Sequence, residues 1–108
     1  MSGVCFLNNA AIAAEELTKR FGKVAVIDFD VHHCNGTQFI FWTRGDVLVT
    51  SIHVDPRLSA PYYAGYADEI GESMGRGLNL NLPLTVRNGP MPTPTHTHPC
   101  APPVTAAR

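Results

Sequence analysis

The stretch that decides the fold is VAVIDFDVHHCNGTQ, residues 24–38. It opens on four apolar residues, 24–27, which leave no polar face. Such a run is typical of a central parallel strand that is covered on both sides. Asp28, Asp30 and His32 then follow at a spacing of two. Side chains alternate along a strand, so this spacing predicts that the three point to the same side.

These three side chains suggest a metal site. Two carboxylates and an imidazole at the end of a buried strand are poorly solvated without a cation. Asp oxygen and His nitrogen are ordinary zinc ligands, and open α/β sheets carry their sites at the carboxyl ends of strands. A single Asp there is more often a helix cap, and a single His is more often packed in the core. The three together, followed by His33, favour a metal.

Length and composition set the class of protein. The chain has 108 residues, enough for one small domain or a piece of a larger one. The 44% hydrophobic content indicates a globular chain, and the net charge of −1 gives no bias toward nucleic acid or membrane. No apolar run is long enough to cross a membrane, and the start does not resemble a signal peptide. Three widely spaced cysteines without a CxxC favour a reducing, cytoplasmic setting.

The first helix is predicted over Asn9 to Phe21. Asn9 can cap it, Lys19 and Arg20 suit its last turn, and Gly22 can end it. One buried stripe follows the three-and-four spacing and comprises Ala10, Ala13, Ala14, Leu17 and Phe21. A helix followed directly by a buried strand indicates an α/β layer.

Further elements follow the metal-like cluster. Residues 34–36, Cys-Asn-Gly, predict a turn, Gln38–Trp42 a short helix, and Arg44–Asp46 its end. Val47–Ile52 predicts a second buried strand, with Ser51 and His53 at its end. His53 is either a second polar group of the site or a packed, hydrogen-bonded histidine.

The remainder contains a loop, a strand and a tail. Asp55–Gly77 is rich in proline and glycine and predicts a functional loop, whose tyrosines either line a pocket or cover the core. Leu78–Leu82 alternates and predicts a strand ended by Pro83. From Thr85 the composition shifts to proline and threonine, so we expect a domain part over 1–84 and a disordered tail over 85–108. A metal site at His96, His98 and Cys100 is disfavoured because prolines interrupt any regular scaffold.

The sequence resembles the zinc-dependent histone deacetylase superfamily. The resemblance runs from Gly3 to about Leu84 and is carried by three motifs in order. They are GVCFLNNAAIAA at 3–14, VAVIDFDVHHCNGTQ at 24–38 and SIHVDPRLSAPYYAGYADEIGESMGRGLNLNLPL at 51–84. The last is similar to the bacterial acetylpolyamine amidohydrolase branch. The resemblance implies an α/β fold with a parallel sheet in three layers, the arginase/deacetylase type, present here in part.

The resemblance also implies roles for individual residues. Asp30 and His32 match two of the three zinc ligands. Asp28 matches a carboxylate that helps to hold a structural potassium ion and orients a catalytic histidine. Asn35 matches the position that supports the second catalytic histidine. Ser51 and the backbone carbonyls of Asp30, His32 and Ile52 match the remaining ligands of that potassium site. Gly3 and Val4 match positions that line the acyl tunnel.

The implied activity is hydrolysis of an acetamide on a primary amine, either an acetylpolyamine or acetyl-lysine. Zinc polarises the carbonyl and activates water, while a histidine pair moves protons. We expect small acetylated amines as partners, no nucleic acid and no membrane. An oligomer is possible in the full-length family.

Departures from the pattern lower the expected activity. The histidine pair precedes the first motif in the family, and the third zinc ligand and an oxyanion-stabilising tyrosine lie beyond the last. We therefore expect a truncated, inactive central part of the enzyme. Cys34 replaces a glycine and Val4 an aromatic residue. Two alternatives remain: an arginase-like two-manganese hydrolase, which Cys34 disfavours because it stands where that class has an Asp, and a non-catalytic remnant.

Overall fold

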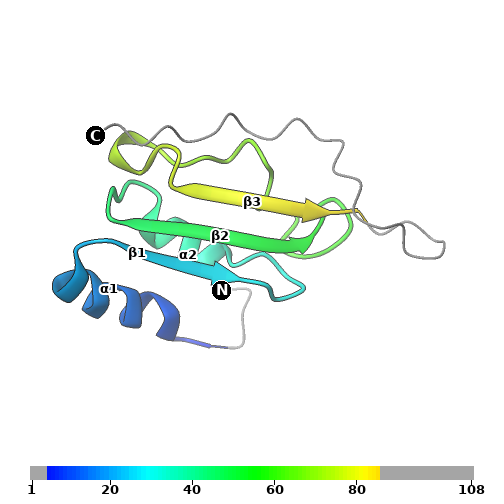
Figure 1. The fold of residues 1–108 in the computed structure, drawn as a ribbon. Coiled ribbons are helices and arrows are strands. Elements are labelled where there is room, and N and C mark those ends of the chain that lie inside the picture. Colours follow the sequence, from blue (N-terminus) through cyan, green and yellow to red (C-terminus); the bar gives the residue numbers. More distant parts are fainter. Residues whose placement is uncertain (1–4, 86–108) are drawn as a thin grey trace.

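A computed structural model describes residues 5–85 of the chain. The three strands form one parallel sheet in the order β1-β2-β3, with β2 in the middle (Figure 1). The elements in chain order are α1 (Asn9–Phe21), β1 (Val24–Asp28), α2 (Asn35–Phe41), β2 (Val47–Val54), the 3-10 turn η1 (Ser73–Gly75) and β3 (Asn79–Leu84). The predicted α/β class with a parallel sheet is confirmed.

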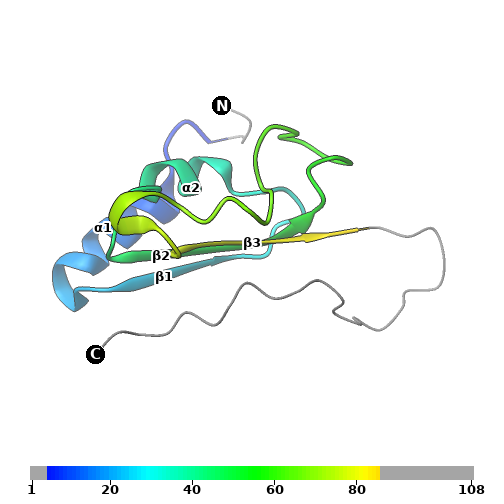
Figure 2. The same cartoon turned by 90° about the horizontal axis from the view of Figure 1, so that it is seen from above.

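Both helices and the loop between β2 and β3 lie on the same side of the sheet (Figure 2). The prediction that 24–27 is a central strand covered on both faces is wrong for the described residues. β1 stands at one edge of the sheet, and Ile27 is 63% exposed on the bare face. Parallel sheets are normally covered on both faces. The elements that would cover this second face are not among residues 5–85.

The alternation in β3 has an unexpected direction. Asn79 and Asn81 are buried, whereas Leu80 and Leu82 are each 39% exposed. The covered side of β3 faces a polar layer made by α2 and the loop, so the asparagines find hydrogen-bond partners there. The leucines lie on the bare face instead.

Helix α1 has the predicted bounds but a different cap and a different buried face. Asn8, not Asn9, caps it, because the Asn8 Oδ1 atom accepts from the Ala11 N–H at 2.9 Å. Gly22 ends the helix, as predicted. The buried residues are Ala11, Ala14 and Thr18, so only Ala14 of the predicted stripe is correct. Leu17 and Phe21 are exposed, at 42% and 63%, because no described element packs on that side of the helix.

Three element boundaries also differ from the prediction. Helix α2 begins at Asn35, with Cys34 as its cap residue, so residues 34–36 start a helix rather than form a turn. β2 continues to Val54 and therefore includes His53. Pro83 lies inside β3, opposite His53. β3 is an edge strand of the described sheet, where a missing N–H is tolerated.

The core between the helices and the sheet is small. Its buried members are Ala11, Ala14, Phe41, Val47 and Val49. Small side chains on α1 allow the helix to lie close to the sheet. The predicted loop 55–77 holds η1 and no other helix or strand. Residues Gly3, Val4 and 86–108 of the predicted tail, with His96, His98 and Cys100, lie outside the described residues.

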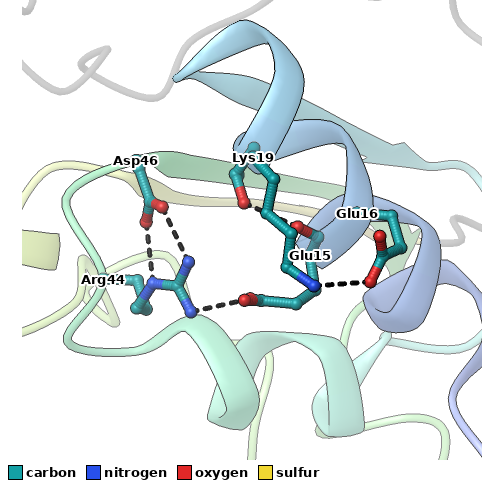
Figure 3. A network of polar contacts seen from close by, with 6 residues as sticks. Glu15, Glu16, Lys19, Arg44 and Asp46 are labelled. Carbon is teal, nitrogen blue, oxygen red and sulfur yellow. Dashed lines mark hydrogen bonds and ion pairs between the residues drawn. The ribbon is translucent and has the colours of Figure 1, made fainter.

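An ion-pair cluster joins α1 to the turn before β2 (Figure 3). The Arg44 guanidinium binds both Asp46 oxygens, at 2.7 and 2.8 Å, and Glu15 Oε2 at 2.9 Å. These carboxylates raise the pKa of Arg44, and Arg44 lowers that of Asp46. The cluster fixes α1 against the segment that follows α2.

Candidate functional site

The segment after β1 folds into two consecutive Asx turns. The Asp30 N–H donates to Asp28 Oδ1 at 2.9 Å, and the His32 N–H donates to Asp30 Oδ1 at 2.8 Å. β1 ends at Asp28, so the predicted alternation along a continuing strand is wrong. Each turn is closed by a bond from a backbone N–H to the aspartate side chain two residues earlier. A hydrogen bond from the Val54 N–H to the Val31 carbonyl ties this segment to the end of β2.

Asp30 and His32 present their side chains together. His32 Nδ1 lies 3.4 Å from Asp30 Oδ1, and the two side chains are 57% and 66% exposed, respectively. Two ligands of one tetrahedral zinc ion, each about 2.0–2.2 Å from it, lie about 3.3–3.6 Å apart. The separation and the donor types therefore fit a shared ion. Asp28 is half-buried beside them, and residues 27–31 line a shallow open depression.

Within residues 5–85, no group of three or more His, Cys, Asp or Glu side chains is placed so that it could hold a metal ion. Asp30 and His32 thus form a pair rather than a closed site. The role of the pair as zinc ligands stays a prediction, as do the roles of Asp28, Asn35, Ser51 and Ile52.

Asp28 and Ser51 are directly paired across β1 and β2. Ser51 is fully buried, and its Oγ atom lies 2.8 Å from His53 Nδ1. His53 is 1% exposed, and its Nε2 atom lies 2.9 Å from the Gly65 carbonyl oxygen. His53 is therefore a packed, hydrogen-bonded histidine that lies against the predicted site.

His33 follows His32 directly in the sequence, and it is the buried member of the two. It is 5% exposed, and its ring lies 4.7 Å from that of His53. Burial, and then the neighbouring His53, lower the pKa of His33 to about 4, although the nearby Glu69 opposes this shift. Neither ring nitrogen makes a hydrogen bond of good geometry within residues 5–85, although Gln38 lies near enough to the ring to act against the lowered pKa. His33 therefore packs as a neutral ring.

Tyr63 and His53 lie at the same end of the sheet as the Asx turns. The Asn35 amide donates to the Tyr63 hydroxyl at 2.9 Å, and Asn35 opens helix α2 directly after the site. Tyr62 and Tyr63 are 63% and 62% exposed. Tyr62 and Tyr63 therefore do not cover the core, and the Tyr63 hydroxyl contacts Asn35 beside the site.

A buried polar network behind the site was missed from sequence. Gln38 is 1% exposed; its Nε2 atom donates to Glu69 Oε2 at 2.7 Å, and its Oε1 atom accepts from Asn79 and Asn81. Glu69 Oε2 also accepts from the Gly65 N–H at 2.9 Å. The only signal in the sequence was a pair of asparagines at spacing two within an apolar strand. The network fixes the loop 65–69 onto α2 and β3.

Cys34 lies near Ser51 and is half-buried. Burial raises the pKa of its thiol to about 11, although a hydrogen bond with Ser51 opposes this shift. A thiol with such a pKa remains protonated near neutral pH, and only the thiolate binds metals well. The argument against a second metal at Cys34 stays a prediction.

Comparison with known proteins matches residues 1–106 to the histone deacetylase domain. The chain belongs to this family. Acetylpolyamine amidohydrolase 2 of Pseudomonas aeruginosa is 59% identical over 85 residues, which are 78% of this chain and 25% of that protein. Acetylpolyamine amidohydrolase of Mycoplana ramosa is 49% identical over 83 residues, which are 76% of this chain and 24% of that protein.

The solved structures agree with the family assignment. The acetylpolyamine aminohydrolase of Burkholderia pseudomallei superposes with a TM-score of 0.75 at 53% identity, over 77% of this chain and 24% of that one. A deacetylase homologue from Aquifex aeolicus gives 0.75 at 42% identity, over 78% of this chain and 23% of that one. The predicted arginase/deacetylase-type fold is thus confirmed in part of its extent. The chain spans about a quarter of the length of these curated relatives.

Among the residues that the structure describes, neither helix has the length and apolarity needed to span a bilayer.

Proposed function

We propose that this chain supplies the central part of a zinc-dependent amidohydrolase domain that removes acetyl groups from acetylated amines. The observation that carries the proposal is the Asp30–His32 pair, with its ligand atoms 3.4 Å apart, at the carboxyl end of a parallel strand. The names of its relatives favour acetylpolyamines over acetyl-lysine as the substrate class.

In this proposal each residue near the turns has one task. Asp30 and His32 hold zinc, which when bound polarises the acetamide carbonyl and activates water. The Asx turn at Asp28 fixes the direction of the Asp30 backbone, so the ligand pair needs little rearrangement. Asp28 and Ser51, paired across the sheet, with the carbonyls of Asp30, His32 and Ile52, hold a potassium ion. Asn35 supports a catalytic histidine and Gly3 and Val4 line the acyl tunnel.

We further propose that the 108-residue chain does not turn over substrate by itself. Its motifs match two of the family's three zinc ligands, and the general acid–base and oxyanion groups of the family have no match in those motifs. Such groups are each worth about 10²–10⁴-fold in rate. The chain would be expected to act only where the remaining parts of the domain are supplied.

Zinc titration by calorimetry tests the ligand pair. We expect weak binding by the wild-type chain and its loss in Asp30→Ala, because one ligand then remains. Asp68→Ala is the matched control, since Asp68 is an exposed carboxylate on the loop 55–77. Equal zinc binding by both variants would show that Asp30 is not a ligand. An assay with acetylputrescine and an acetyl-lysine peptide completes the test, and turnover that Asp30→Ala abolishes would show that the chain is a working enzyme.

A further inference from the structure

We propose that His53 is a positioning residue that accepts a hydrogen bond from the Ser51 hydroxyl and so leaves the lone pairs of the Ser51 oxygen facing a cation beside Asp28. The inference rests on the proposed potassium site. The position of the Gly65 carbonyl decides the direction of the hydrogen bond between Ser51 and His53.

The direction follows from the partners of the His53 ring. His53 Nε2 lies 2.9 Å from the Gly65 carbonyl oxygen, which can only accept, so Nε2 carries the proton. In the neutral ring, Nδ1 then has a lone pair. Ser51 Oγ lies 2.8 Å from Nδ1 and must donate to it. Both side chains are at most 1% exposed, so bulk water does not reach either atom.

The reverse arrangement carries a penalty. If Ser51 donated to the Cys34 sulfur, Nδ1 of His53 would have to carry the ring proton in order to donate to Ser51. The Nε2 lone pair would then face the lone pairs of the Gly65 carbonyl in a buried position. The Ser51 oxygen is thus left with acceptor capacity only, which is the chemistry of an alkali-cation ligand.

The Gly65 carbonyl is itself held in place. Glu69 Oε2 accepts from the Gly65 N–H at 2.9 Å, and Gln38 holds the same oxygen at 2.7 Å. Gly65 has φ +106°, and a Cβ atom there would lie 2.6 Å from His53 Nε2. A side chain at position 65 would therefore collide with the His53 ring. A chain of hydrogen bonds therefore links Glu69, the Gly65 backbone, the His53 ring and Ser51.

Ring nitrogen NMR of the full chain tests the direction without any cation. We expect the His53 proton on Nε2, with Nδ1 unprotonated and coupled to the Ser51 side chain. A proton on Nδ1 would overturn the proposal. In Glu69→Gln, which weakens the hold on Gly65, we expect both tautomers to become populated. In Glu72→Gln, an exposed carboxylate of the same loop, the ring signals should not change.

The consequence for the cation is measured by the rise in unfolding temperature with added potassium chloride, against choline chloride at equal ionic strength. In His53→Leu, Ser51 loses the acceptor for its proton, and we expect about 10- to 100-fold weaker apparent potassium affinity. In His53→Asn, an amide oxygen replaces the Nδ1 lone pair, and most of the affinity should return. Wild-type affinity in His53→Leu would overturn the proposal.

The two proposals fail in different ways. If potassium does not raise the unfolding temperature of the wild-type chain while His53 carries its proton on Nε2, the proposed potassium site fails and the proposed hydrogen-bond direction is supported. Circular dichroism checks that each variant is folded. If His53→Leu does not fold, the tautomer in the wild-type chain and the comparison of His53→Asn with Glu69→Gln still decide the direction of the hydrogen bond.

Discussion

The imidazole rings of His33 and His53 lie 4.7 Å apart, tilted by 45°, beneath the loop that carries Gly65. This contact joins the segment after β1 to the carboxyl end of β2. It also determines how the fold responds to acid, because burial and the neighbouring ring lower the pKa of His33 from 6.5 to about 4. A proton on His33 would place a charge in a position that is only 5% exposed.

The first prediction is a loss of stability as the pH falls. The pKa of His33 is lower in the folded chain than in the unfolded chain, so the unfolded chain takes up the proton first. The contribution of neutral His33 is fully present above about pH 6.5 and is lost as the pH falls toward about 4, by at most about 3 kcal/mol. Urea unfolding across this window measures it. His33→Gln, which does not titrate, should flatten the profile, and an unchanged slope would contradict the assignment.

The second prediction concerns Gly65→Ala. The new Cβ atom would lie 2.6 Å from His53 Nε2 and 2.9 Å from His33 Cγ, at a φ of +106°. We expect a loss of about 2–4 kcal/mol in the free energy of unfolding, from the clash and the backbone strain together. Gly77→Ala is the matched control, because Gly77 has φ +84° with nothing within 4 Å of the new atom. Equal losses in the two variants would show that the contact with the histidines has no cost.

The third prediction compares two ion pairs of α1. Arg44→Ala removes the bonds to both Asp46 and Glu15, and we expect a loss of about 1 kcal/mol after allowing for the solvent around this 37% exposed side chain. Lys19→Ala breaks only an exposed pair with Glu16 and should leave the unfolding temperature unchanged. Thermal unfolding at low and high salt measures both. An effect of Lys19→Ala as large as that of Arg44→Ala would contradict the role given to the cluster in Figure 3.

The fourth prediction concerns the bare face of the sheet. Ile27 and Val26 are neighbours in β1 but face opposite sides, the first exposed and the second packed against the core. Ile27→Lys should reduce self-association and retain the fold, because it breaks an exposed apolar patch. Val26→Lys should destabilise the chain by about 2–4 kcal/mol, since it buries a charge. Sedimentation velocity and circular dichroism distinguish these outcomes. Similar behaviour of the two variants would mean that β1 has no covered face.

Local patterns determined the elements and the family. The bounds of α1 follow from Asn and Gly at its ends and a run of helix-forming residues between them. The apolar runs before Asp28 and Ser51 located the two parallel strands, because β-branched residues with few polar neighbours favour such strands. The Asp28–Asp30–His32 spacing and two further motifs indicated the deacetylase fold, and both the fold and the family are confirmed.

Only the tertiary structure decided which faces are buried and which distant residues meet. Periodicity shows that Asn79 and Asn81 share one side of β3, but not that this side is the covered one. The contact of His33 with His53 and the bond from Glu69 to Gly65 depend on how the loop folds back over the sheet. The direction of the Ser51 hydroxyl depends on the same loop. Such contacts join residues far apart in the chain, whereas spacing along the sequence reports only on neighbours within one helix or strand.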